Sequence, residues 1–198
     1  MSSVTAAEVE YVRQLVHRRA GLVVEPGKDY LVESRLAPIA RSEGLADVAA
    51  LIARVRFAPD GPLHERIIDA MTTNETSWFR DSHPFEALRS TLLPELVERR
   101  RAQRRLTIWS AACSTGQEPY SLAMLVLDSF PELASWRIEI LASDISHDAV
   151  TRARTGRYSQ LEVQRGLQPA TLAEHFTRDG SDWIVSDRVR AMVRFGTV

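Results

Sequence analysis

The sequence predicts an α/β protein in which a small all-helical domain is followed by a parallel sheet flanked by helices. In the first part of the chain, up to Met71, apolar residues recur at the three- and four-residue spacing of amphipathic helices. From Leu106 onward, two short runs typical of buried strands are each followed by a helical pattern. Strand, helix, strand and helix in this order imply parallel strands joined by right-handed crossovers.

The composition is that of a folded globular chain. Of 198 residues, 44% are hydrophobic and 26% are charged, with 25 basic against 26 acidic side chains. This balance excludes a disordered or collagen-like chain and gives no net attraction to nucleic acid. The longest apolar run, Leu122–Leu127, is far shorter than the ~20 residues that cross a bilayer, and the first ten residues lack a secretory pattern. We therefore expect a cytoplasmic protein without a membrane-inserted segment.

Capping residues in the first part of the sequence predict where its helices begin and end. Thr5 and Glu8 have the spacing of a capping box, in which each side chain bonds the other residue's free amide, and Gly21 follows as a C-terminal cap. Three further helical stretches lie between Gly27 and Gly44, between Asp47 and Pro59, and between Leu63 and Met71. We expect an all-helical domain over residues 1–75 and the first part of an α/β domain over residues 76–198.

The strands lie in the second part of the chain. A helix from Ser82 ends in the arginine-rich stretch 99–105. A strand, a tight loop, a helix, a second strand and a second helix then follow at Leu106–Ala112, Cys113–Gly116, Glu118–Phe130, Ile138–Ala142 and Ser146–Gly156. This arrangement is of the Rossmann kind. Beyond it we expect a helix, a turn, a short strand and a last apolar segment, at Pro169–Phe176, Gly180–Ser181, Trp183–Val185 and Ala191–Phe195.

The loop Ala112–Gly116 has small residues at the carboxyl end of a strand, where open parallel sheets bind ligands. It lacks both the three glycines of a dinucleotide fingerprint and the lysine of a phosphate loop, so a phosphate ligand is not favoured. Asp144, at the end of the second strand, is placed to accept both hydroxyls of a ribose. A nucleoside without an obligatory phosphate fits both observations, and S-adenosylmethionine is the common one. Ordinary helix capping explains the same residue types equally well.

Other candidate side chains are explained without a ligand. The arginines of the stretch 99–105 fit a solvated helix end better than a nucleic-acid site. The five histidines show no spacing typical of metal ligands, so no metal site is expected. Cys113 is expected to be a small buried filler. Trp78 and Phe79 belong either to the core or to the wall of a cofactor pocket.

Three stretches of the sequence closely resemble the chemotaxis-receptor methyltransferase (CheR) family. They are MTTNETSWFRD from Met71, WSAACSTGQEPYS from Trp109 and LASDI from Leu141. The resemblance implies a bacterial S-adenosylmethionine-dependent protein-glutamate O-methyltransferase. It also implies a small helical N-terminal domain followed by a Rossmann-like methyltransferase domain with a small antiparallel element.

The resemblance further implies which residues contact the cofactor. Carried over position by position, they are Asn74, Thr76, Arg80, Glu118 and Asp144. Gln117 departs from the Glu that is usual in relatives, and we expect little effect because the next residue is the contacting member of the pair.

The reaction that the family implies does not require a general base from the protein. A substrate glutamate has a pKa near 4.3 and is already the nucleophilic carboxylate at neutral pH. The enzyme must align it with the methyl group and exclude water. We assign the catalytic role to Arg80, whose guanidinium can orient either the substrate carboxylate or the cofactor's own carboxylate. The alternative is a surface ion pair between Arg80 and Asp81 or Glu75.

The expected partner is a methyl-accepting chemotaxis receptor, bound through its acidic cytoplasmic methylation helices. A basic surface on the helical domain would attract them, although acidic residues are interleaved with its arginines, which are Arg35, Arg41, Arg54 and Arg56. No nucleic acid and no membrane insertion are expected.

The α/β part is expected to be incomplete. The stretch Leu106–Val198 is long enough for only about half of a doubly wound sheet, at roughly 30 residues for each strand–helix–strand unit. We therefore expect an uncovered sheet that favours self-association, and little or no methyl transfer by this chain alone. The alternative is a non-catalytic module, derived from this family, that binds a cofactor or partner.

Overall fold

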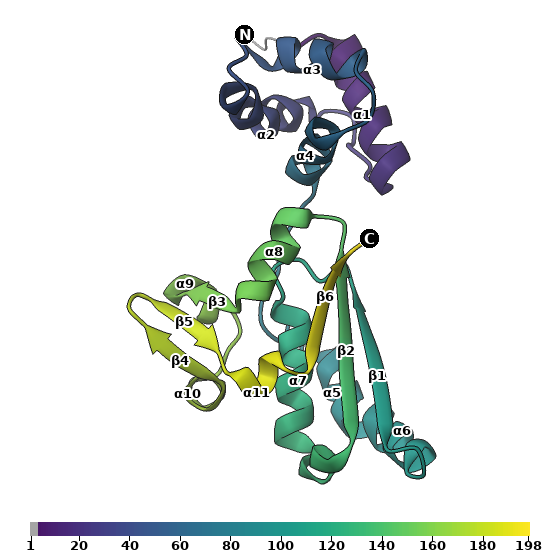
Figure 1. Cartoon of the computed structure of the whole chain (residues 1–198), viewed down its shortest axis with the longest axis vertical. Coiled ribbons are helices and arrows are strands. Elements are labelled where there is room, and N and C mark those ends of the chain that lie inside the picture. The colour runs from purple at the N-terminus through teal and green to yellow at the C-terminus, as the bar shows by residue number, and fades with distance from the viewer. Residues whose placement is uncertain (1–3) are drawn as a thin grey trace. The chain divides into compact units, whose positions relative to one another are not determined.

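The computed structural model describes residues 4–198, and its internal contacts divide the chain into two units (Figure 1). The first unit ends at Thr73, and the second is Asn74–Val198. Each unit has its own cluster of buried apolar side chains, and each is described by itself below.

Within its described residues, 4–73, the first unit contains four helices, as the sequence predicts: α1 (Ala6–Ala20), α2 (Asp29–Ser42), α3 (Val48–Arg56) and α4 (Pro62–Met71). The predicted capping box is confirmed, because the Thr5 hydroxyl accepts the Glu8 N–H while the Glu8 carboxylate accepts the Thr5 N–H at 2.7 Å. Gly21 ends α1 with a φ of 64°, a left-handed conformation that suits glycine. Pro62 opens α4 in its first turn, where a missing N–H costs nothing.

The arginines expected to form a basic surface on this unit are largely occupied by internal contacts. Arg35 donates to the carbonyls of Met71 and Thr72, at 2.7 and 2.9 Å, and so caps the C-terminus of α4. Arg54 pairs with Glu43 at 3.3 Å, and the Arg56 guanidinium lies over the Tyr11 ring. Local structure therefore uses most of the positive charge that the sequence offered to a partner.

The second unit contains the strands and the remaining helices. Its helical elements are α5 (His83–Ala87), the π-helical segment Leu88–Leu92, α6 (Leu93–Arg100), α7 (Gln117–Ser129), the 3-10 segment Pro131–Ser135, α8 (His147–Thr155), α9 (Gln160–Val163), α10 (Pro169–His175) and α11 (Asp187–Arg190). Its strands are β1 (Arg105–Ala111), β2 (Arg137–Asp144), β3 (Arg157–Ser159), β4 (Phe176–Asp179), β5 (Asp182–Val185) and β6 (Val193–Thr197).

The main sheet is parallel, with the strand order β1-β2-β6. Alternate side chains point to opposite faces, and α7 and α8 pack against β2 and β6 on the face that carries Ile140 and Ala142. The opposite face carries Trp109, 68% exposed, beside Leu141, 40% exposed, in direct register. The sheet is therefore covered on one side and open on the other.

A second sheet is small and antiparallel, with the order β3-β5-β4, and it is built within the connection from β2 to β6. Together the two sheets confirm the predicted fold class, including the small antiparallel element. Sequence reasoning missed β3, β4 and α9 because each has only three or four residues, which is too few to establish a periodicity.

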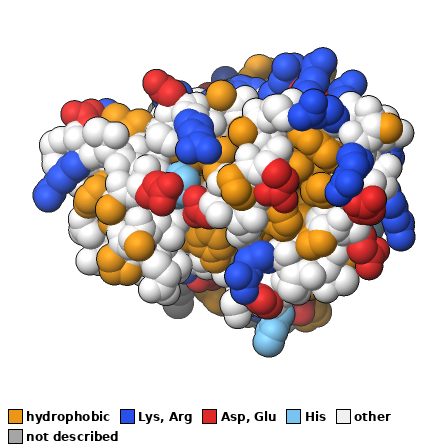
Figure 2. All heavy atoms as spheres, turned by 90° about the horizontal axis from the view of Figure 1, so that it is seen from below, with side chains coloured by type: hydrophobic (Ala, Val, Ile, Leu, Met, Phe, Trp, Pro, Cys, Tyr) orange, Lys and Arg blue, Asp and Glu red, His pale blue; other side chains and the backbone are white. Residues whose placement is uncertain are grey.

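Within the described residues, no helix combines the length and apolar character needed to span a bilayer. One face of the molecule, in Figure 2, shows apolar side chains lying between scattered arginine and acidic side chains. That mixture agrees with the near balance of 25 basic and 26 acidic residues.

We predict that the chain self-associates through the open face of its main sheet, with a dependence on concentration set by mass action. Replacing Trp109 with serine should lower the weight-average mass measured by sedimentation at high concentration. The matched control is Phe57→Ser, which removes an aromatic ring that is 85% exposed in the first unit. A monomeric wild-type chain over the whole concentration range would contradict the prediction.

Candidate functional site

Two loops of the main sheet meet at the carboxylate of Asp144, the last residue of β2. Asp144 is 6% exposed. Its Oδ2 accepts the backbone N–H of Ser114 at 2.7 Å, and its Oδ1 accepts the backbone N–H of Ser146 at 2.8 Å. The carboxylate thereby ties the loop after β1 to the N-terminus of α8, at the edge of the sheet where parallel strands bind ligands.

A third segment, residues 74–80, joins this network through Asn74. The Asn74 amide nitrogen donates to the Ser146 hydroxyl at 3.2 Å, and the Asn74 carbonyl accepts the Ser114 hydroxyl at 2.9 Å. The same Ser146 hydroxyl accepts the Ala149 N–H at 3.0 Å and caps α8. The hydroxyls that fix the two loops therefore also fix the position of Asn74.

The backbone of this region is held in unusual conformations. Ala112 and Ser114 have φ values of 57° and 49°, and Phe79 and Asp81 have 47° and 55°. Non-glycine residues rarely adopt positive φ, and such strain concentrates where a fold positions functional groups. Gly116 has a φ of 96°, and a Cβ there would lie 2.9 Å from the Tyr158 hydroxyl, so this position requires glycine.

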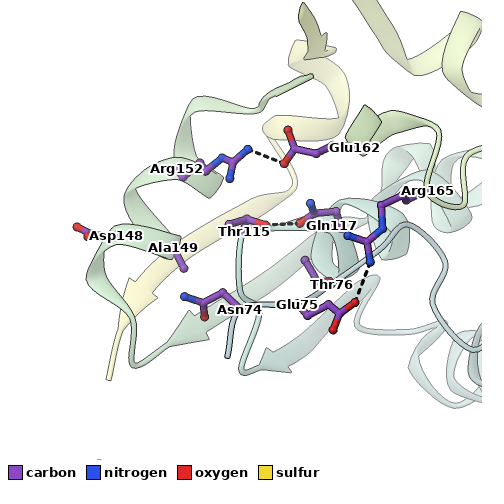
Figure 3. Close-up of a pocket in the computed structure, with 10 residues that line it drawn as sticks. All are labelled: Asn74, Glu75, Thr76, Thr115, Gln117, Asp148, Ala149, Arg152, Glu162 and Arg165. Atoms are coloured by element: carbon purple, nitrogen blue, oxygen red, sulfur yellow. Dashed lines mark hydrogen bonds and ion pairs between the residues drawn. The ribbon is translucent and has the colours of Figure 1, made fainter. Parts of the chain in front are cut away.

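Beside the network lies a cavity of about 340 Å³ within the second unit (Figure 3). Thr115 donates to the Gln117 amide oxygen at 2.8 Å in its wall. Two ion pairs line it as well, Arg165 with Glu75 at 3.1 Å and Arg152 with Glu162. The lining residues are Asn74, Glu75, Thr76, Thr115, Gln117, Asp148, Ala149, Arg152, Glu162 and Arg165. The cavity is polar and is formed by elements that the loops after β1 and β2 bring together.

Comparisons with known proteins identify this combination of helices and sheet. A family profile described as the SAM binding domain of CheR methyltransferase matches residues 74–198, and the one described as its all-alpha domain matches residues 7–72. The chain belongs to the CheR methyltransferase family. Chemotaxis protein methyltransferase 1 of Pseudomonas aeruginosa is 40% identical over 198 residues, which cover 98% of this chain and 71% of that protein.

Two further relatives have similar values. The chemotaxis protein methyltransferase Cher2 of Pseudomonas putida is 38% identical, over 95% of this chain and 70% of that protein. The chemotaxis protein methyltransferase of Vibrio parahaemolyticus is also 38% identical, over 98% of this chain and 72% of that protein. The resemblance seen in the sequence is thus confirmed, and the cofactor of this CheR chain is S-adenosylmethionine.

The polar groups around Asp144 fit that cofactor. Each carboxylate oxygen of Asp144 accepts one backbone N–H and keeps a second lone pair, which can accept a ribose hydroxyl. The first turn of α7 adds Glu118, whose exposed carboxylate accepts the Ser110 hydroxyl at 2.6 Å and can receive a cationic group. Acceptors for hydroxyls and for a positive charge are what a sulfonium nucleoside needs.

The structure brings some of the residues expected from the sequence together and leaves others apart. Asn74 and Thr76 line the cavity, and Asp144 joins Asn74 through the two serines. Arg80 does not line the cavity: its guanidinium donates to the Glu75 carbonyl at 3.1 Å, lies 3.7 Å from the Asp81 carboxylate, and is 61% exposed. The contacts of Arg80 in this structure are those of the surface alternative, and its catalytic role remains a prediction.

Cys113 lies in the loop after β1 and is 1% exposed. Burial, together with the nearby Asp144 carboxylate, raises the pKa of its thiol to about 12, so the thiolate is scarce at neutral pH. We predict that the folded chain reacts with Ellman's reagent at pH 8 far more slowly than the chain unfolded in guanidinium. Equal rates in the two states would contradict this assignment of Cys113 as an inert filler.

Sequence reasoning missed several residues of the site because their roles depend on the fold. The bond between Ser114 and Asp144 and the bonds of both serines to Asn74 span 30 or more residues, and only the role of Ser146 as the cap of a helix was recognisable in the sequence. Elsewhere, Asp128, Glu174 and His175 place potential ligand atoms within 4.8 Å of one another, with His175 Nε2 2.7 Å from Asp128 Oδ1. The sequence did not predict this cluster, because Asp128 and His175 are 47 residues apart in the chain.

Proposed function

We propose that the protein carrying this sequence transfers the methyl group of S-adenosylmethionine to glutamate side chains of a chemotaxis receptor, giving glutamate methyl esters. The observation that supports the proposal most is the network around Asp144. It joins the 74–80 segment, the loop after β1 and the loop after β2, the three stretches whose sequences resemble the family.

We assign the cofactor contacts to Asn74, Thr76, Arg80, Glu118 and Asp144. The bound cofactor supplies an electrophilic methyl group on a sulfonium sulfur. Asp144 would hold the ribose, and the Glu118 carboxylate would attract the cationic end of the amino acid portion. Arg80 would move from its exposed position to hold a carboxylate. The move costs little free energy, because an ion pair exposed to water contributes little to stability.

The names of the relatives, which are chemotaxis protein methyltransferases, support a chemotaxis receptor as the substrate. A glutamate suits the role of acceptor because its carboxylate is already ionised at neutral pH. Methyl transfer to it therefore requires no general base. The protein's contribution is to align the two reactants and to exclude water from the carboxylate. We propose the cytoplasm as the location, where the methylation helices of such receptors lie.

The test is methyl transfer from radiolabelled S-adenosylmethionine to a receptor cytoplasmic fragment by the natural gene product that carries this sequence. Glutamate methyl esters hydrolyse in mild base, so the label should be released as volatile methanol. A fragment in which the candidate glutamates are replaced by alanine is the matched control. Base-stable label, or label on the alanine fragment, would contradict the proposal.

Cofactor binding without methyl transfer would favour the other candidate, a non-catalytic binding module. Calorimetry with S-adenosylhomocysteine separates the two, because it measures the cofactor site without any acceptor. We expect the Arg80→Ala variant to lose more methyl transfer than affinity for S-adenosylhomocysteine if Arg80 orients the substrate, and both equally if it holds the cofactor.

A further inference from the structure

The 74–80 segment is held from one side by residues 160–166, which comprise α9 and the turn after it. The backbone N–H of Trp78 donates to the Arg165 carbonyl at 3.0 Å, and the Trp78 indole N–H donates to the Glu162 carbonyl at 3.1 Å. The Trp78 side chain is 1% exposed and makes edge contacts with Tyr158 and Phe176. Residues 160–166 therefore hold the backbone and the indole N–H of Trp78, while Tyr158 and Phe176 contact its ring.

Gly166 makes the close approach possible. A Cβ at this position would lie 3.0 Å from the carbonyl carbon of Trp78 and closer still to its oxygen, a separation that real Cβ atoms essentially never show. Gly166 also has a φ of 112°, which L side chains rarely adopt. Among the described glycines it has the shortest distance of this kind, and the atom it faces is rigid backbone.

The opposite side of the 74–80 segment is held by α7. The Phe79 N–H donates to the Ser121 hydroxyl at 3.1 Å, and that hydroxyl in turn donates to the Gln117 carbonyl at 2.7 Å. Ser121 is fully buried, so this bond cannot be replaced by water. The segment thus runs between α7 and residues 160–166 with backbone bonds on both sides.

Two further contacts fix residues 160–166 themselves. The Ser159 hydroxyl accepts the Glu162 N–H while the Glu162 carboxylate accepts the Ser159 N–H at 2.9 Å, which is a capping box for α9. At the cavity, Arg165 pairs with Glu75 at 3.1 Å, as Figure 3 shows. Both side chains of that pair are exposed, so it contributes little to stability. The capping box and the backbone hydrogen bonds therefore contribute most to holding residues 160–166 in place.

We propose that Gly166 and the Ser159–Glu162 capping box are positioning residues for the cofactor site. They set the backbone of Trp78, and through it the residues two and four positions earlier, Thr76 and Asn74. This inference rests on the proposed function only in treating Asn74 and Thr76 as cofactor contacts. It adds residues 160–166, which lie outside all three stretches that resemble the family.

The first test compares Gly166→Ala with Gly180→Ala by calorimetric titration of S-adenosylhomocysteine. Gly180 also has a positive φ, 63°, but a Cβ there meets nothing within 4 Å, so this control carries backbone strain without a clash. Loss of a well-aligned hydrogen bond to a ligand lowers affinity by about tenfold. We expect Gly166→Ala to weaken binding by about tenfold or more, and Gly180→Ala to leave it unchanged.

The second test does not depend on Gly166→Ala folding well. Ser159→Ala and Thr5→Ala each remove one capping box, in the second and first unit respectively. Both should lower thermal stability by a similar amount, yet only Ser159→Ala should weaken S-adenosylhomocysteine binding. Ser159→Thr keeps the hydroxyl and should restore binding, a rescue that a general loss of stability would not produce.

Hydrogen exchange at the amides of Trp78 and Phe79 gives a readout that needs no cofactor. We expect both amides to exchange faster in Gly166→Ala and Ser159→Ala than in the two controls. Unchanged exchange, or equal cofactor affinity in the variants and controls, would overturn the inference. A wild-type chain that binds no S-adenosylhomocysteine would contradict the proposed function instead, and the exchange rates would still decide this inference.

Discussion

Asp144→Ala is expected to weaken the binding of S-adenosylhomocysteine by about tenfold to a hundredfold, the loss that follows from removing a charged hydrogen-bond acceptor. The substitution removes the proposed ribose contact. It also leaves the backbone N–H groups of Ser114 and Ser146 without their acceptor, so the two loops lose their common anchor. Calorimetry on the wild type and the variant measures the change directly.

Two control variants separate these effects. Asp187→Ala removes a fully exposed carboxylate of the same unit and should leave the affinity unchanged. Asp144→Asn keeps the side-chain shape and one acceptor oxygen, so we expect an intermediate affinity. Wild-type affinity in Asp144→Ala would exclude Asp144 from the cofactor site.

Trp78→Ala is expected to lower the free energy of unfolding of the second unit by about 3–5 kcal/mol. The substitution empties the volume of a large side chain that is 1% exposed, and it removes the indole hydrogen bond to Glu162. Urea unfolding followed by tryptophan fluorescence measures the change. All four tryptophans of the chain lie in the second unit, so the signal reports that unit alone.

Trp109→Ala is the matched control for Trp78→Ala. It deletes the same side chain from a position that is 68% exposed, where substitutions in a chain dilute enough to be monomeric usually change stability by no more than about 0.5 kcal/mol. Similar losses in the two variants would show that Trp78 is not a core residue and would remove the physical basis for the contacts assigned to residues 160–166.

The fold was predictable wherever a sequence signal is local. The Thr5–Glu8 capping box, the start of the third helix at Asp47 and the glycine after α1 depend on residues within one helical turn, and all three are present as expected. Strands β1 and β2 were predictable because short runs rich in apolar, β-branched and aromatic residues are typical of strands, whereas the segment of β6 was expected only to be apolar. Exposure of Trp109, in the middle of such a run, was not predictable, because it depends on which face of the sheet is covered.

The candidate site was predictable only as far as the family resemblance reached. Asp144 could also be reasoned from its place at the end of a strand, whereas Arg80 could not be placed, because the conformation of an exposed arginine is set by weak contacts. Ser121 and Gly166 left no signal in the sequence, and Ser146 was recognisable only as the cap that starts a helix. Their roles come from partners 42 to 88 positions away, and no periodicity or local motif reports such pairings.

The bond between Trp78 and Glu162 joins residues 84 positions apart, and this separation has a consequence for synthesis. At the usual rate of chain elongation, roughly 4 to 17 s pass between the addition of the two residues. During that interval the large apolar surface of Trp78 has none of its partners from residues 158–176 and is open to chaperones and to other nascent chains. The 74–80 segment is therefore among the first parts of the second unit to be made, and it reaches its described conformation only after residues 158–176 have been made.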